Sequence, residues 1–323
     1  MYPKVCAVIP TRNRKDITLR FLESFSKQSY INLDTVIVDA NSTDGTQDAV
    51  VRKFPKITLI NVDDNSYWTA STNRGVELAL RKGYDFILTI NDDSNIDTDY
   101  VANLVQLSVK NNILILGSRI DYMLKPGLIW SLGAYSQWGS REILQLSYHT
   151  QWADNLPSRI REKDFIDVDS LPGNGVLIHR SVFEQIGIYD EFWLPHYHSD
   201  SEFIMRAIKK GIPAYCAVNV VVYNDCPVEE TEIKITTLRQ LFYTYFKKKS
   251  HLFFVPIFYL VLMYCPFGKK LLTLMYVYLT PIIIPFKDKL LLITEKIQKA
   301  RRLLLKLSLI FISWLINLRF RNE

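Results

Sequence analysis

The chain has 323 residues, of which 48% are hydrophobic and 22% charged, so it can bury an ordinary core and is neither disordered nor fibrous. Its net charge of +6 is uneven: residues 234–323 carry 16 Lys and Arg against three acids, whereas residues 1–233 carry 23 against 30. Nucleic acid would explain the basic charge of the tail but not the apolar runs beside it, so we expect no nucleic-acid partner.

The cysteines and the N-terminus indicate a reducing compartment. The four cysteines lie far apart, with no CxxC pair and no metal-ligand spacing, which argues against a disulfide framework or a zinc site. The first residues lead directly into a short apolar run instead of the longer run of a secretory signal. We therefore expect the protein to face the cytosol.

Short apolar runs alternate with amphipathic stretches, which predicts an α/β fold with a parallel, doubly wound sheet. Ligands of such sheets bind beyond the carboxyl ends of the strands. Strands are predicted at 4–9, 33–40, 57–62, 85–90, 113–118 and 214–225, helices at 17–28, 69–83 and 98–110 and within 41–54 and 196–211, and a turn, strand and helix at 171–192.

Residues 119–165 lose this periodicity and gain aromatic residues, so we expect a long irregular segment that is functional or mobile. Its aromatic side chains, Trp130 and Trp138 among them, could stack on sugar rings or on lipid. Most aromatic residues at such spacings belong to a core, and that alternative stays open.

The C-terminal part contains three apolar runs, at 251–267, 271–286 and 303–318, each slightly shorter than the roughly 20 residues of a membrane span. Core helices of a small domain would normally show a polar face, and these runs show little of one. We favour helices that lie on a membrane or are partly embedded in it, with the Lys and Arg residues facing anionic lipid. Residues 231–323 are therefore expected to form a helical, membrane-associating region.

Acidic residues follow two of the predicted strands. Asp39 ends the second strand, and Asp92 and Asp93 follow the fourth, in FILTINDDSN, so all three should lie at one edge of the sheet. Adjacent carboxylates repel each other and lose hydration when buried, so they need solvent, a cation or a raised pKa. They could be solvated loop residues or a helix cap, or they could hold Mg²⁺ or Mn²⁺ together with substrate phosphates.

Several common nucleotide and nucleophile motifs are missing. The sequence has no GxGxxG after its first strand, no GxxxxGK[ST] phosphate loop and no GxSxG nucleophile elbow. These absences argue against a dinucleotide-binding enzyme, a phosphate-loop enzyme and a serine hydrolase of that type.

Six motifs in order, VCAVIPTRNR, VIVDANSTDGT, NRGVELAL, TINDDSNI, LPGNGVLIHRSVFEQIGIYDE and HSDSEFIMRAIKKGI, resemble the family 2 glycosyltransferases of GT-A fold. The resemblance covers about residues 4–225. It implies a Rossmann-like, mostly parallel central sheet with flanking helices in a catalytic domain at residues 1–230. The nucleotide-binding half would comprise about residues 1–118 and the acceptor-binding half about residues 119–230.

The resemblance also implies a nucleotide-sugar site. The loop after the first strand would lie against the nucleotide, Asp39 would accept from the nucleobase or ribose, and Asn73 with Arg74 would approach the diphosphate or sugar. UDP and dTDP both fit an aspartate that reads a pyrimidine. Residues 172–175 would let backbone approach the sugar, although they also fit an ordinary turn. The implied donor-binding residues are Pro10, Thr11, Arg12, Asp39, Asn73, Arg74, Asp92, Gly173 and Asn174.

Asn91-Asp92-Asp93 resembles the family's DxD metal motif with Asn in the first position. Asp93 would be the principal ligand of Mg²⁺ or Mn²⁺, with Asp92 as a second ligand or a contact to ribose or sugar. Many members place a His after the last strand as a further ligand, and the matching position here is Asn224. The remaining ligand could therefore come from Asn224, Asp225, His196 or His198.

The sequence Ser199-Asp200-Ser201-Glu202 resembles the family's second acidic signature at the start of a helix. Inverting transfer needs a general base that takes the proton of the acceptor hydroxyl, and Asp200 matches that catalytic base. Glu202 would be its orienting partner. A helix cap is the alternative role of Asp200, and Asp44, in the turn before the second helix, leaves the same choice open.

The resemblance and the tail together predict an inverting, metal-dependent hexosyl- or rhamnosyltransferase on the cytoplasmic face of the cell membrane. It would move sugar from a nucleotide-diphosphate donor to a saccharide or lipid-linked acceptor, in the synthesis of surface polysaccharide or lipopolysaccharide. One alternative is a nucleotidyltransferase, but the loop PTRNRKD lacks the glycines that such enzymes carry. Another is a non-catalytic membrane scaffold on a transferase fold.

Overall fold

The computed structural model describes residues 2–227, 237–280, 283 and 299. Its strands are β1 (Val5–Thr11), β2 (Leu33–Asp39), β3 (Thr58–Asn61), β4 (Phe86–Thr89), β5 (Ser94–Ile96), β6 (Ile115–Tyr122), β7 (Lys125–Ser131), β8 (Ala134–Ser136), β9 (Leu144–Leu146), β10 (Phe165–Val168), β11 (Val176–His179) and β12 (Ala214–Asn224). Its helices are α1 (Lys15–Phe25), α2 (Thr46–Lys53), α3 (Trp68–Lys82), α4 (Tyr100–Lys110), α5 (Ser158–Arg161), α6 (Arg180–Ile186), α7 (Ser199–Lys209), α8 (Leu238–Phe246) and α9 (Phe254–Tyr264), with short 3-10 turns at η1 (Ala153–Asn155) and η2 (Phe267–Lys269).

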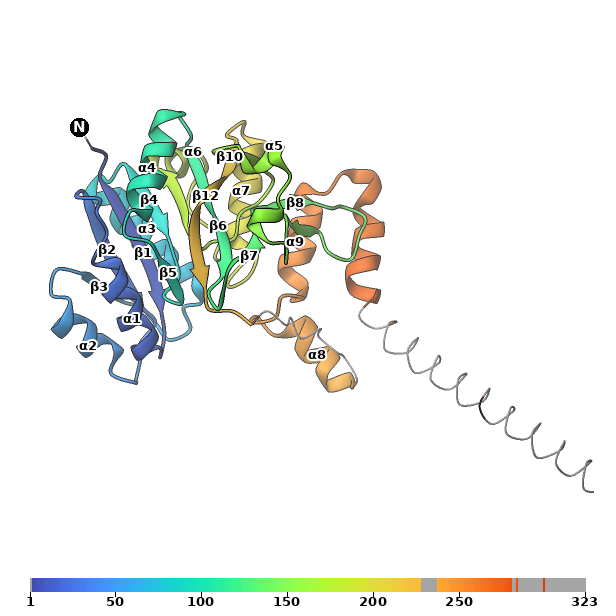
Figure 1. Cartoon of the computed structure of the whole chain (residues 1–323). Coiled ribbons are helices and arrows are strands. Elements are labelled where there is room, and N and C mark those ends of the chain that lie inside the picture. Colours follow the sequence, from blue (N-terminus) through green and yellow to red (C-terminus); the bar gives the residue numbers. More distant parts are fainter. Residues whose placement is uncertain (1, 228–236, 281–282, 284–298, 300–323) are drawn as a thin grey trace, which may run out of the picture.

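A central ten-stranded sheet runs in the order β10-β12-β6-β11-β4-β1-β2-β3, with β5 paired to β12 and β7 to β6 (Figure 1). The pairs β1–β2, β1–β4, β2–β3 and β6–β12 are parallel. Strand β11 is antiparallel and lies between β4 and β6. The predicted α/β class with a mostly parallel sheet is therefore confirmed.

Helices cover both faces of the sheet, which explains why its strands are apolar throughout. Along β1, Val5, Ala7 and Ile9 belong to the core formed with α1, α2 and α4. Cys6 and Val8 belong to the core formed with α3, α6 and α7 on the other face. Alternate residues of one strand thus fill two different cores.

Helix α3 packs unusually close to the sheet at Gly75. A Cβ at this position would lie 2.3 Å from Cγ1 of Val8 and 3.2 Å from Cγ2 of Val38, so no side chain fits without displacing β1 or β2. The glycine of NRGVELAL therefore fixes the distance between α3 and the strands that lead into the predicted site.

The prediction of an irregular segment at 119–165 is wrong for much of its length. Strand β6 continues to Tyr122, β7 pairs with it antiparallel, and β8 and β9 form a separate two-stranded sheet. The β6–β7 register shifts twice within residues 120–122, and such irregularities interrupt the alternation on which strand prediction depends. Trp138 packs against a hydrophobic cluster, as the core alternative expected. Trp130 packs against another cluster but also lines the cavity described below, so for it both alternatives stay open.

The described C-terminal helices lie beside the sheet-containing part of the chain (Figure 1), and their apolar side chains belong to a third hydrophobic cluster. Ile257, Leu260 and Val261 of α9 meet Met205 of α7 and Ile143, which precedes β9. In the part of the chain that the structure describes, no helix is long and apolar enough to cross a membrane. The run at 303–318 and the end of the run at 271–286 lie outside the described residues.

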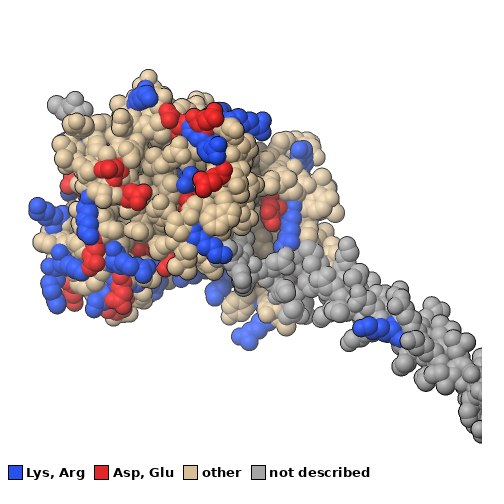
Figure 2. All heavy atoms as spheres, viewed as in Figure 1, with Lys and Arg blue, Asp and Glu red and all other residues tan. Residues whose placement is uncertain are grey.

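Figure 2 shows one face of the molecule, on which basic and acidic side chains are interspersed over the sheet-containing part. This face carries no broad area of a single charge sign. The expectation that nucleic acid is not a partner stays a prediction.

Candidate active site

A cavity of about 630 Å³ lies at the carboxyl ends of the strands. Its walls come from the loops after β1 and β4, the turn before β11 and the segment before α7. The structure therefore brings together most of the predicted site residues. Those that line the cavity are Pro10, Thr11, Arg12, Asp92, Asp93, Gly173, Asn174, His196, His198, Asp200 and Asn224.

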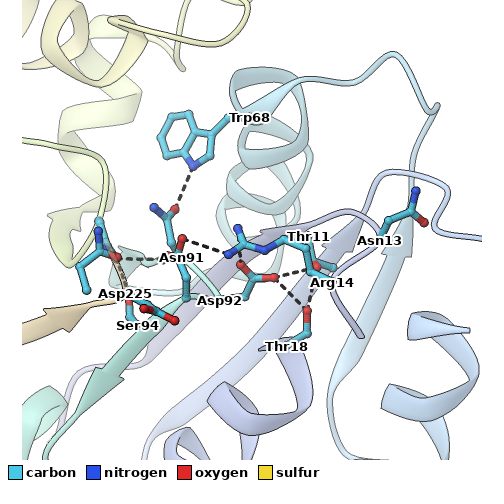
Figure 3. Close-up of polar contacts among 12 residues, drawn as sticks. Thr11, Asn13, Arg14, Thr18, Trp68, Asn91, Asp92, Ser94 and Asp225 are labelled. Carbon is cyan, nitrogen blue, oxygen red and sulfur yellow. Dashed lines mark hydrogen bonds and ion pairs between the residues drawn. The ribbon is translucent and has the colours of Figure 1, made fainter. Parts of the chain in front are cut away.

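Asp92 is 2% exposed, and the protein itself satisfies both of its carboxylate oxygens. Oδ2 accepts hydrogen bonds of 2.8 Å from the hydroxyls of Thr11 and Thr18, and Oδ1 lies 3.1 Å from Nη1 of Arg14 (Figure 3). Burial raises the pKa of Asp92 above its ordinary value, although Arg14 opposes this shift. In this arrangement Asp92 anchors the loop after β1, and both of its oxygens already have partners inside the protein. The sequence had led us to expect a contact between Asp92 and metal or sugar instead.

Asp93, unlike Asp92, has one carboxylate oxygen without a partner in the described part of the chain. Its Oδ2 lies 3.1 Å from Nη2 of Arg14, whereas Oδ1 is buried without a hydrogen-bond partner in the described part of the chain. A buried carboxylate oxygen normally has a partner, so this oxygen is placed to receive a ligand. The importance of Arg14 was missed in the sequence, where only the overall charge of its loop was noted. A basic residue after β1 opposite two acids was the available signal.

Amide side chains form the middle of the cavity wall. Asn91 accepts from Nε1 of Trp68 at 3.1 Å, and its backbone N–H donates to Oδ1 of Asn174 at 2.9 Å (Figure 3). Asn174 also accepts from the hydroxyl of Ser94 and donates to Oδ1 of Asn224 at 3.4 Å. The position where family members place a histidine is thus occupied by an amide tied to another amide.

Asp200 lies in the first turn of α7 and faces the same cavity. Its Oδ2 accepts from the backbone N–H of Gly173 at 2.7 Å, and Oδ1 accepts from that of Ser201 at 2.8 Å. A Cβ at Gly173 would lie 2.6 Å from the Trp68 ring and 3.2 Å from Cβ of Asp200. Glycine at 173 therefore permits the close approach of Trp68, Asp200 and the turn.

Glu202 does not contact Asp200, so its predicted role as an orienting partner is not supported by the geometry. It is 1% exposed, and it accepts from the Tyr264 hydroxyl at 2.5 Å and from Nη2 of Arg206 at 3.1 Å. Because helical residues two apart point in different directions, Glu202 faces α9 while Asp200 faces the cavity. Glu202 joins α7 to the C-terminal helices.

Asn73 and Arg74 also lie away from the cavity, contrary to the expectation that they approach the donor. The fully buried Asn73 donates to the carbonyl of Tyr189 at 2.9 Å and accepts from its N–H at 3.1 Å. Arg74 pairs with Glu77 and Glu191, each at 2.9 Å. Both residues hold the segment after α6 against α3, which is a structural role.

Asp39 is fully buried next to Ala40, which lines the cavity. Its Oδ1 accepts from the Ser42 N–H and from Nε2 of Gln47, both at 2.7 Å. Its Oδ2 is buried without a partner in the described residues. Asp39 itself does not line the cavity, but one of its oxygens is available to a group that reaches it.

Two other side chains act as local caps. Asp44 accepts from the N–H groups of Lys15 and Thr46, both at 3.0 Å, and so serves the starts of α1 and α2. His179 accepts from the N–H of Ser181 at the start of α6. These contacts favour the capping role that was left open for Asp44.

Two cavity residues come from the C-terminal part of the chain, and sequence reasoning missed them. Lys249 and His251 lie between α8 and α9 and face the cavity beside His196, Tyr197 and His198. Burial, together with the charges of Lys249 and His251, lowers the pKa of His196 to about 4. No local motif marks Lys249 and His251, because only the tertiary fold brings them to the cavity.

The donor set fits a metal ion through a single carboxylate. Among the described residues, no three His, Cys, Asp or Glu side chains are grouped as a metal site. Of the predicted ligands, Asp93 offers a buried, unpartnered oxygen and His196 a buried, unpartnered Nδ1. Mg²⁺ commonly takes one or two carboxylates and completes its octahedron with waters and substrate phosphates, so Asp93 fits such an ion when a diphosphate is also bound.

A comparison with protein families gives the class. The model for glycosyl transferase family 2 matches residues 6–187, which is more than half of the chain. The chain belongs to this family, as the sequence motifs indicated. Glycosyl transfer is therefore the class of chemistry of the family to which this chain belongs.

The relatives are distant. A protein named "Putative colanic acid biosynthesis glycosyl transferase WcaA" from Escherichia coli (strain K12) is 34% identical over 94 residues, which are 28% of this chain and 33% of that protein. The chain thus spans about a third of this relative.

Solved structures match over a longer part of the chain. S. aureus TarS has a TM-score of 0.51 at 15% identity, covering 69% of this chain and 37% of that one. The mannosyltransferase PcManGT from Pyrobaculum calidifontis, solved with GDP-Man and Mn²⁺, has a TM-score of 0.49 at 18% identity, covering 70% and 58%. The likeness to TarS supports a GT-A-like fold, and the fold alone.

Proposed function

We propose that the cavity binds a nucleotide-diphosphate sugar with Mg²⁺ or Mn²⁺ and transfers the sugar, with inversion, to an acceptor hydroxyl. The observation that carries the proposal is the unpartnered, buried Oδ1 of Asp93 in the cavity that Asp200 also lines. One carboxylate is thus available to a cation on a diphosphate, and a second is available to a proton.

Asp93 would hold the metal ion, which when bound neutralises the charge that develops on the diphosphate leaving group. Arg14, 3.1 Å from both acidic side chains, keeps the negative charge of this corner compensated before substrate arrives. The ion pair also fixes the side chain of Asp93, because its Oδ2 is held while Oδ1 stays free.

Asp200 would act as the general base. The acceptor oxygen attacks the anomeric carbon, the bond from that carbon to the phosphate oxygen breaks, and the acceptor proton moves to Asp200. The backbone N–H groups of Gly173 and Ser201 orient the carboxylate without competing for its role, because neither is an acid at neutral pH.

Asp39 supports a pyrimidine donor. Its free Oδ2 is an acceptor, and the ring N–H of uracil or thymine is a matching donor. UDP-sugar or dTDP-sugar is therefore the proposed donor type, and a saccharide or lipid-linked saccharide of surface polysaccharide or lipopolysaccharide is the proposed acceptor.

Isothermal titration of the full chain with UDP, dTDP, GDP and CDP, with and without Mn²⁺, tests this proposal. We expect one pyrimidine nucleotide to bind only with metal and Asp93→Ala to lose that binding. Asp99→Ala is the matched control, because Asp99 does not line the cavity and its carboxylate accepts from the hydroxyl of Ser29. Metal-independent binding, or equal losses in both variants, would contradict the proposed metal site.

We also propose that residues 1–230 form the catalytic domain and that residues 231–323 hold it at the cytoplasmic face of the cell membrane. Large apolar side chains of the described tail are exposed, with Phe267 at 92% and Leu271 at 73%, and Lys269 and Lys270 lie between them. Such a surface suits an anionic bilayer. Replacing Phe267 and Leu271 by Ser should reduce flotation with anionic vesicles, whereas Leu124→Ser, at an equally exposed position of the catalytic part, should not.

A further inference from the structure

The segment between α8 and α9 forms part of the cavity wall. The ring of His251 stacks on that of Tyr197, with centroids 3.7 Å apart, and the backbone carbonyl of His251 lies 3.1 Å from Nε2 of His198. Tyr197 and His198 immediately precede the helix that carries Asp200. The connection between α8 and α9 is therefore fastened to the segment that positions the candidate base.

This connection places Lys249 at the cavity. The arginines of the cavity have acidic partners, and Lys249 differs from them in this respect. Arg14 is paired with Asp92 and Asp93, and Arg12 contacts the backbone carbonyl and the carboxylate of Asp64. Lys249, by contrast, contacts the Tyr67 ring at 5.9 Å and has no ion pair within the described residues.

The groups beside Lys249 are aromatic rings and a neutral imidazole. His196 is buried beside it, and the lowered pKa of this histidine keeps the imidazole neutral at pH 7. Tyr67 and Tyr197 supply aromatic walls on either side of His196. Lys249 itself is exposed, so its ammonium group is open to an anion that enters the cavity, and a hydrogen bond between two charged groups is stronger than one between neutral groups.

A phosphate group is the anion that matches this position. The lysine ammonium acts as a compact point charge for phosphate oxygens, and the nucleoside diphosphate that leaves the sugar carries more negative charge than one divalent ion compensates. The proposed donor carries such a diphosphate, and a lipid-linked acceptor carries phosphate as well.

We propose that Lys249, held in place by the stacking of His251 on Tyr197, is a phosphate-binding residue that the C-terminal segment contributes to the transfer site. This inference rests on the proposed function and extends it beyond residues 6–187, the part that the family model matches. The ligand is a phosphate or diphosphate group, whether of the nucleotide donor or of a lipid phosphate.

Lys248 provides a matched control. The Nζ atoms of Lys248 and Lys249 lie 5.7 Å and 5.9 Å from the same Tyr67 ring, but Lys249 alone of the two lines the cavity. Substituting either lysine by Ala removes one charge and one ring contact from the same loop. A general effect of charge or of loop stability would therefore appear in both variants, and a phosphate contact only in Lys249→Ala.

The first arm of the experiment is titration of full-length wild type, Lys249→Ala, Lys249→Arg and Lys248→Ala with UDP and Mn²⁺, with uridine as the ligand without phosphate. Loss of one charge-assisted contact should weaken UDP binding by about tenfold in Lys249→Ala. UDP affinity should stay within about twofold of wild type in Lys248→Ala, and Lys249→Arg should retain most of it. Uridine binding should not distinguish the variants.

The second arm measures cosedimentation with phosphatidylcholine vesicles that do or do not contain a polyprenyl phosphate. If Lys249 binds the phosphate of an acceptor lipid, Lys249→Ala loses the preference for the phosphate-containing vesicles and keeps its UDP affinity. A loss in either arm supports the inference and identifies the source of the phosphate.

Two results would overturn the inference: unchanged binding of Lys249→Ala in both arms, or equal losses in Lys248→Ala. The proposed function fails separately. If wild type binds no nucleotide with metal, the metal site at Asp93 is refuted and the vesicle arm alone decides the role of Lys249. If wild type binds and Lys249→Ala binds equally well in both arms, only the phosphate contact is refuted.

Discussion

The two acidic corners of the cavity hold their carboxylates in different ways. At the end of β4, Arg14 lies between Asp92 and Asp93 and leaves a single oxygen unpartnered among the described residues. At the start of α7, Asp200 is oriented by the backbone N–H groups of Gly173 and Ser201. The guanidinium compensates the negative charge of the carboxylates and so favours the binding of further charged groups beside them. The backbone amides fix the orientation of the Asp200 carboxylate and leave it able to take a proton. The difference suggests one corner for the diphosphate and the other for the acceptor.

The largest effect should come from Asp200→Asn, which removes the base and preserves the shape. An amide oxygen can still accept from one backbone N–H, so the fold should persist while turnover falls by about 10²–10⁴-fold. Release of nucleoside diphosphate from the donor that the titrations identify measures this loss.

Asp190→Asn is the control for that prediction. Asp190 also accepts from two backbone N–H groups, those of Phe192 and Trp193, but it does not line the cavity. If the two variants are equally active, Asp200 is not the general base, and the proposed difference between the two acidic corners is wrong.

The next smaller effect is expected at Glu202. Its substitution should lower the stability of the fold and leave the transfer reaction itself unaffected. Glu202→Ala leaves Arg206 and the Tyr264 hydroxyl without their shared partner inside the protein, which should lower the free energy of unfolding by about 3 kcal/mol. Urea denaturation measures it. Glu184→Ala, which breaks the exposed pair with Arg180, should cost about 0.5 kcal/mol or less. Reduced turnover with unchanged stability would instead restore Glu202 as the orienting partner of the base.

The smallest effect concerns pH. His196 has a pKa of about 4 in the folded protein against an ordinary 6.5, so between these values the unfolded chain binds more protons. The free energy of unfolding should therefore fall as the pH drops from about 7 towards 4, by an amount on the order of 1 kcal/mol once solvent exposure is allowed for. His196→Gln should flatten this part of the pH profile. Identical profiles for the two proteins would show that the imidazole is not shielded by the segment at 249–251.

The sheet could be predicted from the sequence because both of its faces are covered. Continuous apolar runs such as Val5–Ile9 and the capped helices between them are local signals, and they produced β1 to β4 in the correct order. Strand β7 was missed because the irregular pairing with β6 disturbs the alternation of its residues. Family motifs placed Asp93 and Asp200 at the cavity, and their chemical roles stay predictions.

The contacts that distinguish neighbouring residues could not be predicted. The family motif gave Asp93 the main role and Asp92 a secondary one, but it did not indicate that Arg14 and two threonines decide which oxygen stays free. Asn73 follows the family pattern, yet it caps backbone groups of Tyr189, more than a hundred positions away. Lys249 has no local signal of function. In each case the decisive partner is distant in the chain, and periodicity and motifs carry no information about it.

The hydrogen bond between Glu202 and Tyr264 has a practical consequence for the design of a shorter, more soluble variant of this protein. Cutting the chain after residue 227 would remove the apolar side chains that cover Met205 and Ile143, and Glu202 would lose its hydrogen bond from Tyr264 and keep only Arg206. It would also remove Lys249 from the pocket. Solubility is better sought by exchanging outward-facing side chains such as Phe242, Phe246 and Phe267 for polar ones, with the tail left attached.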